Sequence, residues 1–380
     1  MTNRVTTTQE TKATTDAVRL LPRDRLADLF HALTARGYQV IGPRVDQGAI
    51  IYDQLTSVEE LPRGWTDEQG PGYYRLKRRE DDDAFGYVVG PHSWKRYLFP
   101  PLVTLARIER DGEDWHIESQ PESPVKRAFL GVRACELAAI AVQDRVFLSQ
   151  AYVDPIYQAR RESVCLIAAN CTQAAATCFC TSMDTGPRCR SGFDLAITEI
   201  AAGYIVEVGS ELGASLAADL PLRPASPEDQ SDGEAARARA VAQIERTLDT
   251  HDIRALLMNN LDHPQWDDVG QRCLSCTNCT MVCPTCFCCS VTEVGDLTEQ
   301  HIERQRQWDS CFHPDFSYIN GGQVRGQVRS RYRQWLTHKL ATWIDQFDVS
   351  GCVGCGRCIT WCPVGIDLTE EVAAIRGNPS

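Results

Sequence analysis

Two copies of one cysteine spacing constrain this chain more than any other feature of its sequence. The first copy follows C-x2-C-x2-C-x3-C and consists of Cys273, Cys276, Cys279 and Cys283, with Pro284 directly after it. The second copy repeats that spacing with Cys352, Cys355, Cys358 and Cys362, followed by Pro363. Three cysteines two residues apart wrap a loop around one corner of an iron–sulfur cube. The fourth cysteine, turned away by the proline, points to the other cluster.

This crossover predicts two ligand sets for two [4Fe–4S] clusters of the bacterial dicluster ferredoxin type. The first set comprises Cys273, Cys276, Cys279 and Cys362. The second set comprises Cys352, Cys355, Cys358 and Cys283. Zinc is the alternative, but a structural zinc site uses paired C-x2-C units, so the further cysteines of each copy would be surplus.

The cysteine content and the charge narrow the class of protein. The chain carries 18 cysteines in 380 residues, and long chains of this kind without a secretory signal use grouped thiols for metal rather than for disulfides. The N-terminal residues lack the apolar core of such a signal, so we expect a cytoplasmic protein. A net charge of −12 argues against nucleic acid as a partner, and no apolar run is long enough for membrane insertion.

Hydrophobic periodicity predicts an α+β protein with a tail and two domains. We expect a disordered tail over 1–16, a mixed α/β domain over 17–240 and a helical dicluster domain over 241–380. Strand and helix patterns alternate in 126–170 and 193–220, whereas 221–236 reads as an exposed loop before a helix over 235–260. After Gln265 the strand signals fade and helical segments separate the cysteine groups.

An N-terminal group of cysteines predicts a third [4Fe–4S] site. Its proposed ligands are Cys135, Cys171, Cys178 and Cys180. Cys135 opens a predicted helix after a strand, where the helix N-terminus favours a thiolate, and the other three follow an apolar strand, where α/β folds place ligands. Structural thiols or zinc are the alternatives. Cys165 lies within an apolar run and is expected in the core, and Cys189 is a reserve ligand.

Other residues near the motifs have more than one interpretation. Gly351, Gly354 and Gly356 allow tight turns that aim N–H groups at sulfur. Arg272 and Arg357 either offset cluster charge or are solvated, and His338 reads as a core or capping residue rather than a ligand. With four ligands assigned to each site, the remaining cysteines are expected to pack near the clusters; these are Cys286, Cys288, Cys289 and Cys311.

Several motifs together resemble the β subunit of cytosolic, NAD(P)-linked [NiFe] hydrogenases (sulfhydrogenases), a family that also includes an electron-transfer component of anaerobic sulfite reductase. The motifs are GVRACELAAI (131–140), NCTQAAATCFCTSMDTGP (170–187), CLSCTNCTMVCPTCFC (273–288), WDSCF (308–312), RYRQWLTHKLATW (331–343) and GCVGCGRCITWCPVGID (351–367). The chain departs from the family pattern at Ala134, Glu136 and Asp184, where the family usually has Pro, Asp and Gly. None of these departures removes a ligand.

The resemblance implies a non-catalytic electron-transfer subunit of an oxidoreductase. Such a subunit relays single electrons between a flavoprotein subunit that binds NAD(P) and the small and large subunits of a [NiFe] hydrogenase, with the flavin on the partner. The absence of a G-x-G-x-x-G fingerprint after a strand fits that division. The alternatives are a flavin-binding iron–sulfur oxidoreductase, a zinc-stapled interaction protein and an electron-transfer subunit of sulfite reductase.

Overall fold

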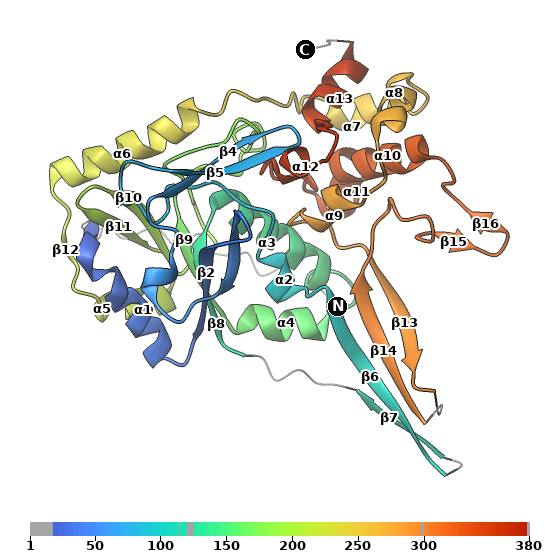
Figure 1. The fold of residues 1–380 in the computed structure, drawn as a ribbon, viewed down its shortest axis with the longest axis horizontal. Helices are drawn as coiled ribbons and strands as arrows, with labels where there is room; N and C mark the ends of the chain where they lie inside the picture. Colours follow the sequence, from blue (N-terminus) through green and yellow to red (C-terminus); the bar gives the residue numbers. More distant parts are fainter. Residues whose placement is uncertain (1–17, 113, 120–124, 298–299, 378–380) are drawn as a thin grey trace, which may run out of the picture.

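The computed structural model describes residues 18–112, 114–119, 125–297 and 300–377, so the predicted tail over 1–16 lies outside the described residues. Its main feature is an eight-stranded sheet with the order β12-β1-β11-β10-β9-β8-β2-β3. The strands of this sheet are β1 (Arg19–Pro22), β2 (Gln39–Asp46), β3 (Ala49–Gln54), β8 (Arg127–Val132), β9 (Val164–Ala169), β10 (Leu195–Ile200), β11 (Gly203–Val208) and β12 (Arg223–Pro224). Figure 1 shows this sheet on one side of the molecule and the C-terminal helices gathered on the other.

The centre of the sheet is parallel, because β10, β9, β8 and β2 pair in that direction. Every residue of β9 and β10 is buried, as expected for strands covered on both faces. One face packs against α1 (Leu26–Ala35) and α5 (Glu211–Ala218). The other packs against α2 (Lys95–Leu98), α3 (Ala134–Phe147) and α4 (Pro155–Glu162). The predicted strand-to-helix order of this region is confirmed.

The prediction for 221–236 is wrong, because this stretch begins a helix, α6 (Pro227–Ala242), which lies along β10 and β11. The Ser226 hydroxyl accepts a hydrogen bond from the Asp229 N–H at 3.1 Å, and Pro227 occupies the first helical position. Proline, serine and acidic residues therefore start a helix here rather than a loop. The predicted helix over 235–260 is also interrupted, since α6 ends at Ala242 and α7 begins only at Ile253.

The C-terminal helices surround a second core. They are α7 (Ile253–Asn259), α8 (Gln265–Arg272), α9 (Asn278–Met281), α10 (Val328–Thr337), α11 (Trp343–Phe347), α12 (Arg357–Thr360) and α13 (Leu368–Arg376). A π-helical turn, His338–Thr342, joins α10 to α11. The predicted apolar face of this long helical segment is confirmed, because its members are all buried: Tyr332, Trp335, Leu336, Leu340 and Trp343. None of the helices in the described residues is long and apolar enough to span a membrane.

The expectation that strands fade after Gln265 is wrong, because two long strands and a short hairpin lie between the cysteine motifs in the described residues. These strands, β13 (Cys289–Gly295) and β14 (His301–Trp308), join β6 (Leu102–Asp111) and β7 (Asp114–Ser119) in an arm that projects from the body in Figure 1. Most of the residues in β14 are polar, so its sequence shows no apolar face. It pairs with its neighbour β13 on one side and with β6, from the N-terminal half, on the other, so its place in the sheet depends on these pairings rather than on an apolar pattern.

Smaller elements complete the described chain. Two hairpins pair β4 (Trp65–Gly70) with β5 (Tyr73–Arg78) and β15 (Tyr318–Ile319) with β16 (Gly322–Gln323). Short 3-10 turns cover Arg23–Arg25 and Val58–Glu60. The β4–β5 hairpin reaches the second cysteine motif, where the Gly72 N–H donates to the Ile359 carbonyl oxygen at 3.1 Å.

Candidate iron–sulfur sites

The structure gathers four of the predicted ligands in one cavity, called site 1. They are Cys273, Cys276, Cys279 and Cys362, so the first motif meets the last cysteine of the second motif. Phe312, Tyr332 and Trp335 supply an apolar wall. Backbone N–H groups point at the sulfurs, since Ser275 donates to Cys273 Sγ at 3.4 Å and Ile366 donates to Cys362 Sγ at 3.3 Å. Such donors stabilise a thiolate-bound cluster.

A second cavity, site 2, collects the other predicted set. It is lined by Cys283, Cys352, Cys355 and Cys358. The Gly354 N–H donates to Cys352 Sγ at 3.5 Å. The Cys283 sulfur has two polar neighbours, Lys339 Nζ at 3.2 Å and Thr285 Oγ1 at 3.1 Å. Lys339 was not predicted to lie at a cluster site, because a lysine in a helix usually faces water.

Glycine is required at two positions of the site 2 loop. Gly354 and Gly356 have φ values of +63° and +77°, which disfavour other residues. A Cβ atom at Gly354 would lie 2.6 Å from the Phe179 carbonyl oxygen, and one at Gly356 would lie 2.4 Å from that of Thr177. The second motif therefore presses its backbone directly against the N-terminal loop that carries Cys178 and Cys180.

The N-terminal group forms a third cavity, site 3, lined by Cys135, Cys171, Cys178 and Cys180. Cys135 lies in the first turn of α3, directly after β8, and Cys171 follows β9. Because β8 and β9 are parallel neighbours, their carboxyl ends place these two thiols together. Asp184, in the loop that follows Cys180, has a φ of +53°, a conformation that suits the glycine expected from the family pattern.

The remaining N-terminal cysteines lie outside site 3. Cys165 is 0% exposed in the sheet core, which agrees with the sequence interpretation. Cys189 is buried in the cluster of side chains beneath α3, and its N–H donates to the Asn170 side chain at 2.7 Å. Neither residue lines the site 3 cavity.

The three sites form a row with site 2 in the middle. Cys358, a predicted ligand of site 2, also lines site 1. Cys355, another predicted ligand of site 2, also lines site 3. A single loop over 352–358 therefore contacts all three cavities.

A buried ion pair lies between sites 2 and 3. Arg357 Nη2 donates to Glu136 Oε1 at 2.5 Å, and both side chains are almost fully buried. The other Glu136 oxygen accepts from the Tyr52 hydroxyl at 2.8 Å and from the Trp94 indole at 3.0 Å. Arg357 is therefore not solvated, and its charge acts on Cys355 and Cys135. Arg272, by contrast, is partly exposed and paired with Asp268 and Glu371, each at 2.7 Å.

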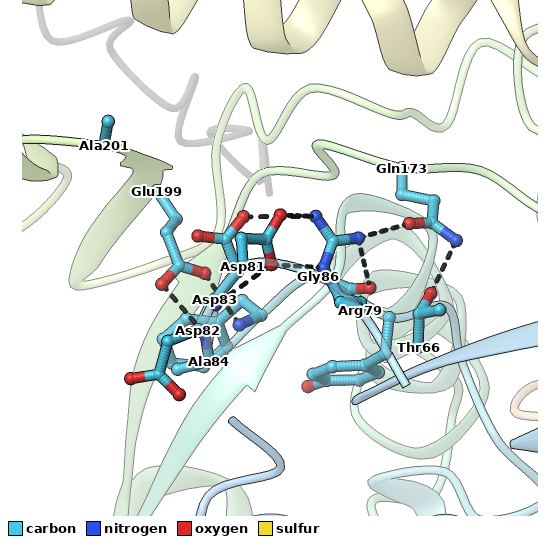
Figure 2. Close-up of polar contacts among 12 residues, drawn as sticks. Thr66, Arg79, Asp81, Asp82, Asp83, Ala84, Gly86, Gln173, Glu199 and Ala201 are labelled. Atoms are coloured by element: carbon cyan, nitrogen blue, oxygen red, sulfur yellow. Dashed lines mark hydrogen bonds and ion pairs between the residues drawn. The ribbon is translucent and has the colours of Figure 1, made fainter. Parts of the chain in front are cut away.

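Polar networks brace the loops around site 3. Figure 2 shows the Arg79 guanidinium between Asp81, at 2.6 Å, and the Gln173 side chain, at 2.7 Å. Gln173 also donates to Thr66 Oγ1 at 2.7 Å and lines site 3 beside Cys171. This network fixes the start of the cysteine loop against the β4 strand.

A second buried network ties the β4–β5 hairpin to both cysteine loops. Asp67 accepts from Val88 N at 2.7 Å and from the Gln69 amide at 2.6 Å. The Thr360 hydroxyl donates to Gln69 Oε1 at 2.8 Å and lies 2.8 Å from the Thr177 hydroxyl. Burial raises the pKa of Asp67 to about 6.

Burial disfavours the thiolate form of the ligands when no iron is bound. It raises the pKa of Cys178 and of Cys352 to about 12, and it raises the pKa of Cys135 well above the usual value despite the helix N-terminus. Iron would stabilise the thiolates by direct bonding, so its binding at these sites would release the thiol protons. Cys283 differs, since a hydrogen bond from the Cys286 thiol lowers its pKa, helped by the charge of Lys339.

Comparison with known proteins supports the same kind of site. Residues 272–366 match the 4Fe-4S dicluster domain, which contains both motifs. Over 352 residues the chain is 28% identical to sulfhydrogenase 2 subunit beta of Pyrococcus furiosus, covering 92% of this chain and 95% of the relative. The resemblance to hydrogenase β subunits is thereby confirmed. No solved structure shows significant similarity to the chain.

Proposed function

We propose that this chain, which over nearly all of its length resembles a hydrogenase β subunit, is an iron–sulfur electron-transfer subunit. It would relay single electrons between a [NiFe] hydrogenase module and an NAD(P)-linked flavoprotein subunit. The observation that carries the proposal is the row of three cysteine-lined cavities, in which neighbouring sites share a loop. Clusters in neighbouring cavities that share a lining cysteine would pass electrons from one to the next.

We assign one [4Fe–4S] cluster to each site, with the four cysteines of that site as ligands. The donor set is all thiolate, as such clusters require. Two positive charges lie close to site 2, Lys339 beside Cys283 and Arg357 beside Cys355. They offset the negative charge of a thiolate-bound cluster, which favours its reduced form.

Site 1 is the end of the row that a redox partner can reach. Cys276 is exposed, and it is flanked by Leu274, 64% exposed, and by Val364, 43% exposed. Sites 2 and 3 lie deeper, since their cysteines are buried or half-buried. We therefore place the contact with one redox partner over the site 1 loop. The flavin belongs to a partner protein, and the complex is expected in the cytoplasm.

This proposal is tested by measuring iron, acid-labile sulfide and zinc per chain in the same sample of anaerobically purified protein. We expect about twelve irons and no stoichiometric zinc, because three cubes hold four irons each. About eight irons would limit the relay to sites 1 and 2. Stoichiometric zinc in place of iron would refute the electron-transfer function itself.

A matched pair of variants tests the row. Cys135→Ser should remove about four irons and slow electron transfer through the chain, whereas Cys165→Ser, in the sheet core, should retain the full iron content. Purification of the complex then tests the partners. Recovery of flavoprotein and hydrogenase subunits supports the proposed pathway, and recovery of a sirohaem protein supports the sulfite reductase alternative.

A further inference from the structure

Four of the six cysteines outside sites 1 to 3 lie around one further cavity. Cys286, Cys288, Cys289 and Cys311 line a cavity of 430 Å³, a size typical of small-molecule sites. Its other walls include Arg325, Lys339 and His338, together with aromatic and amide side chains. None of the described residues that line it is acidic.

Two of these thiols, Cys288 and Cys311, lie on neighbouring segments. The pairing of β13 with β14 sets Cys289 opposite Trp308, which brings Cys288 and Cys311 to the same end of that ladder, and both residues line the cavity. A cube holds its ligands apart at separate corners, whereas thiols in contact can form a disulfide.

The pair is held at a junction of three segments. The Asp309 N–H donates to the Cys288 carbonyl oxygen at 2.9 Å, which fixes the start of β13 beside the segment that carries Cys311. Cys288 and Cys311 are both half-buried, so they are accessible from the cavity. Lys339 lines both this cavity and site 2, where its Nζ lies 3.2 Å from Cys283 Sγ, and so connects the two.

The charge around the pair suits an anion. Lys339 Nζ is buried and has no carboxylate within 4 Å in the described part of the chain. Lys95 is buried in the same way, donating only to the carbonyl oxygens of Thr280, Met281 and Cys286. The charges of both ammonium groups lower the pKa of Cys288. A buried ammonium group without an anion beside it is costly in free energy. Hydrogen bonds from Cys311 lower the pKa of Cys288 to about 7, which provides a thiolate near neutral pH.

We propose that Cys288 and Cys311 form a redox-active dithiol that takes electrons from site 2 and reduces an anionic small-molecule disulfide in the cavity. The Cys288 thiolate attacks the bound disulfide, forming a mixed disulfide and releasing one thiol as its sulfur leaves and takes a proton. The Cys311 thiolate then attacks Cys288, which releases the second thiol and leaves a Cys288–Cys311 disulfide. Two electrons, delivered singly from site 2, and two protons restore the dithiol. This step rests on the relay proposed above.

The test uses the full chain with its clusters, purified without oxygen, and two probes of opposite charge. Dithiodiglycolate, an anionic disulfide, should convert Cys288 and Cys311 into a cross-link that mass spectrometry detects after alkylation, without loss of iron. Cystamine, which is cationic, should react about tenfold more slowly, because the cavity is positively charged. Cys289 lines the same cavity, and the Cys289→Ser variant should react as the wild type does. In the Cys311→Ser variant, the reaction should stop at a mixed disulfide on Cys288.

Reduction of the clusters at a poised electrode should then reopen the cross-link in the wild type. In a Cys283→Ser variant, whose cluster at site 2 is impaired, the cross-link should form but reopen much more slowly. The proposal is overturned if Cys288 and Cys311 never cross-link, or if Cys311→Ser lowers the iron or zinc content, since the thiols would then hold metal. A cross-link that forms in protein with about twelve irons but never reopens refutes the link to site 2 while leaving the relay intact.

Discussion

Replacing Lys339 by methionine should lower the reduction potential of the cluster at site 2. The Lys339 ammonium is buried and lies 3.2 Å from Cys283 Sγ, so it stabilises the additional electron of the reduced cluster. That electron spreads over the cube, at a mean distance of about 6 Å from the charge. With an effective dielectric constant of about 20, the interaction is worth about 3 kcal/mol, or about 120 mV for one electron.

Methionine suits this test because it has a similar length and no charge. EPR-monitored titration of the three clusters should show one midpoint falling by about 100 mV while the other two move far less. Lys339→Arg, which keeps the charge, should shift that midpoint by no more than a few tens of millivolts.

Arg272→Gln is the matched control, because Arg272 adjoins the ligand Cys273 in sequence yet is partly exposed and already paired with Asp268 and Glu371. We expect it to move no midpoint by more than about 30 mV, as exposed pairs are screened. A Lys339→Met protein with full iron content and three unchanged midpoints would refute the argument that this lysine sets the potential of site 2.

Three further changes test the sites and the fold. Cys283→Ser should remove or convert the cluster held mainly by the second motif, and EPR showing damage only to the cluster nearest in sequence would contradict the crossover. Cys178→Ser should lower the iron content by about four per chain while the dicluster signals persist, and an unchanged iron assay would exclude the third cluster. Burial raises the pKa of Asp67 to about 6, above the value of about 3.9 in an unfolded chain, so folding favours its protonated form. The stability of the wild type should therefore fall as pH rises from about 4 to 6, by up to about 3 kcal/mol, and thermal unfolding at pH 5 and 7 should show a smaller loss for Asp67→Asn.

The cysteine spacing predicts two ligand sets, and each set lines one cavity of the structure. The cavity grouping of Cys283 with the second motif and of Cys362 with the first agrees with the crossover expected from the motifs alone. The pattern can be read because the four cysteines and the proline of each motif lie close together in the sequence, although the predicted ligand sets join the two motifs. Helix α3 and strand β8 were predictable because each contains a local run that is mostly apolar.

Charged groups around the sites were not predictable in this way. The ion pair of Arg357 with Glu136 joins residues that are 221 positions apart, and only the packing of the second motif on α3 creates it. Lys339 is buried because a π-helical turn and the Gly351 backbone enclose its ammonium group. The polar strand β14 has no strand pattern in its own sequence, and it is placed by its pairing with β13 and with β6. These features arise from long-range contacts, which periodicity does not describe.

The crossed ligands that we propose for sites 1 and 2 have a consequence for the biogenesis of the protein. Neither proposed cube would be complete until Cys283 and Cys362 had been carried across to the opposite motif, so cluster insertion and closing of the C-terminal core would be one event. The eight-stranded sheet has its own apolar core, which contains none of the proposed ligands. In an iron-starved cell we therefore expect a half-finished chain, folded over the sheet and open to proteases over its C-terminal helices, and iron supply would then set the amount of this protein that survives.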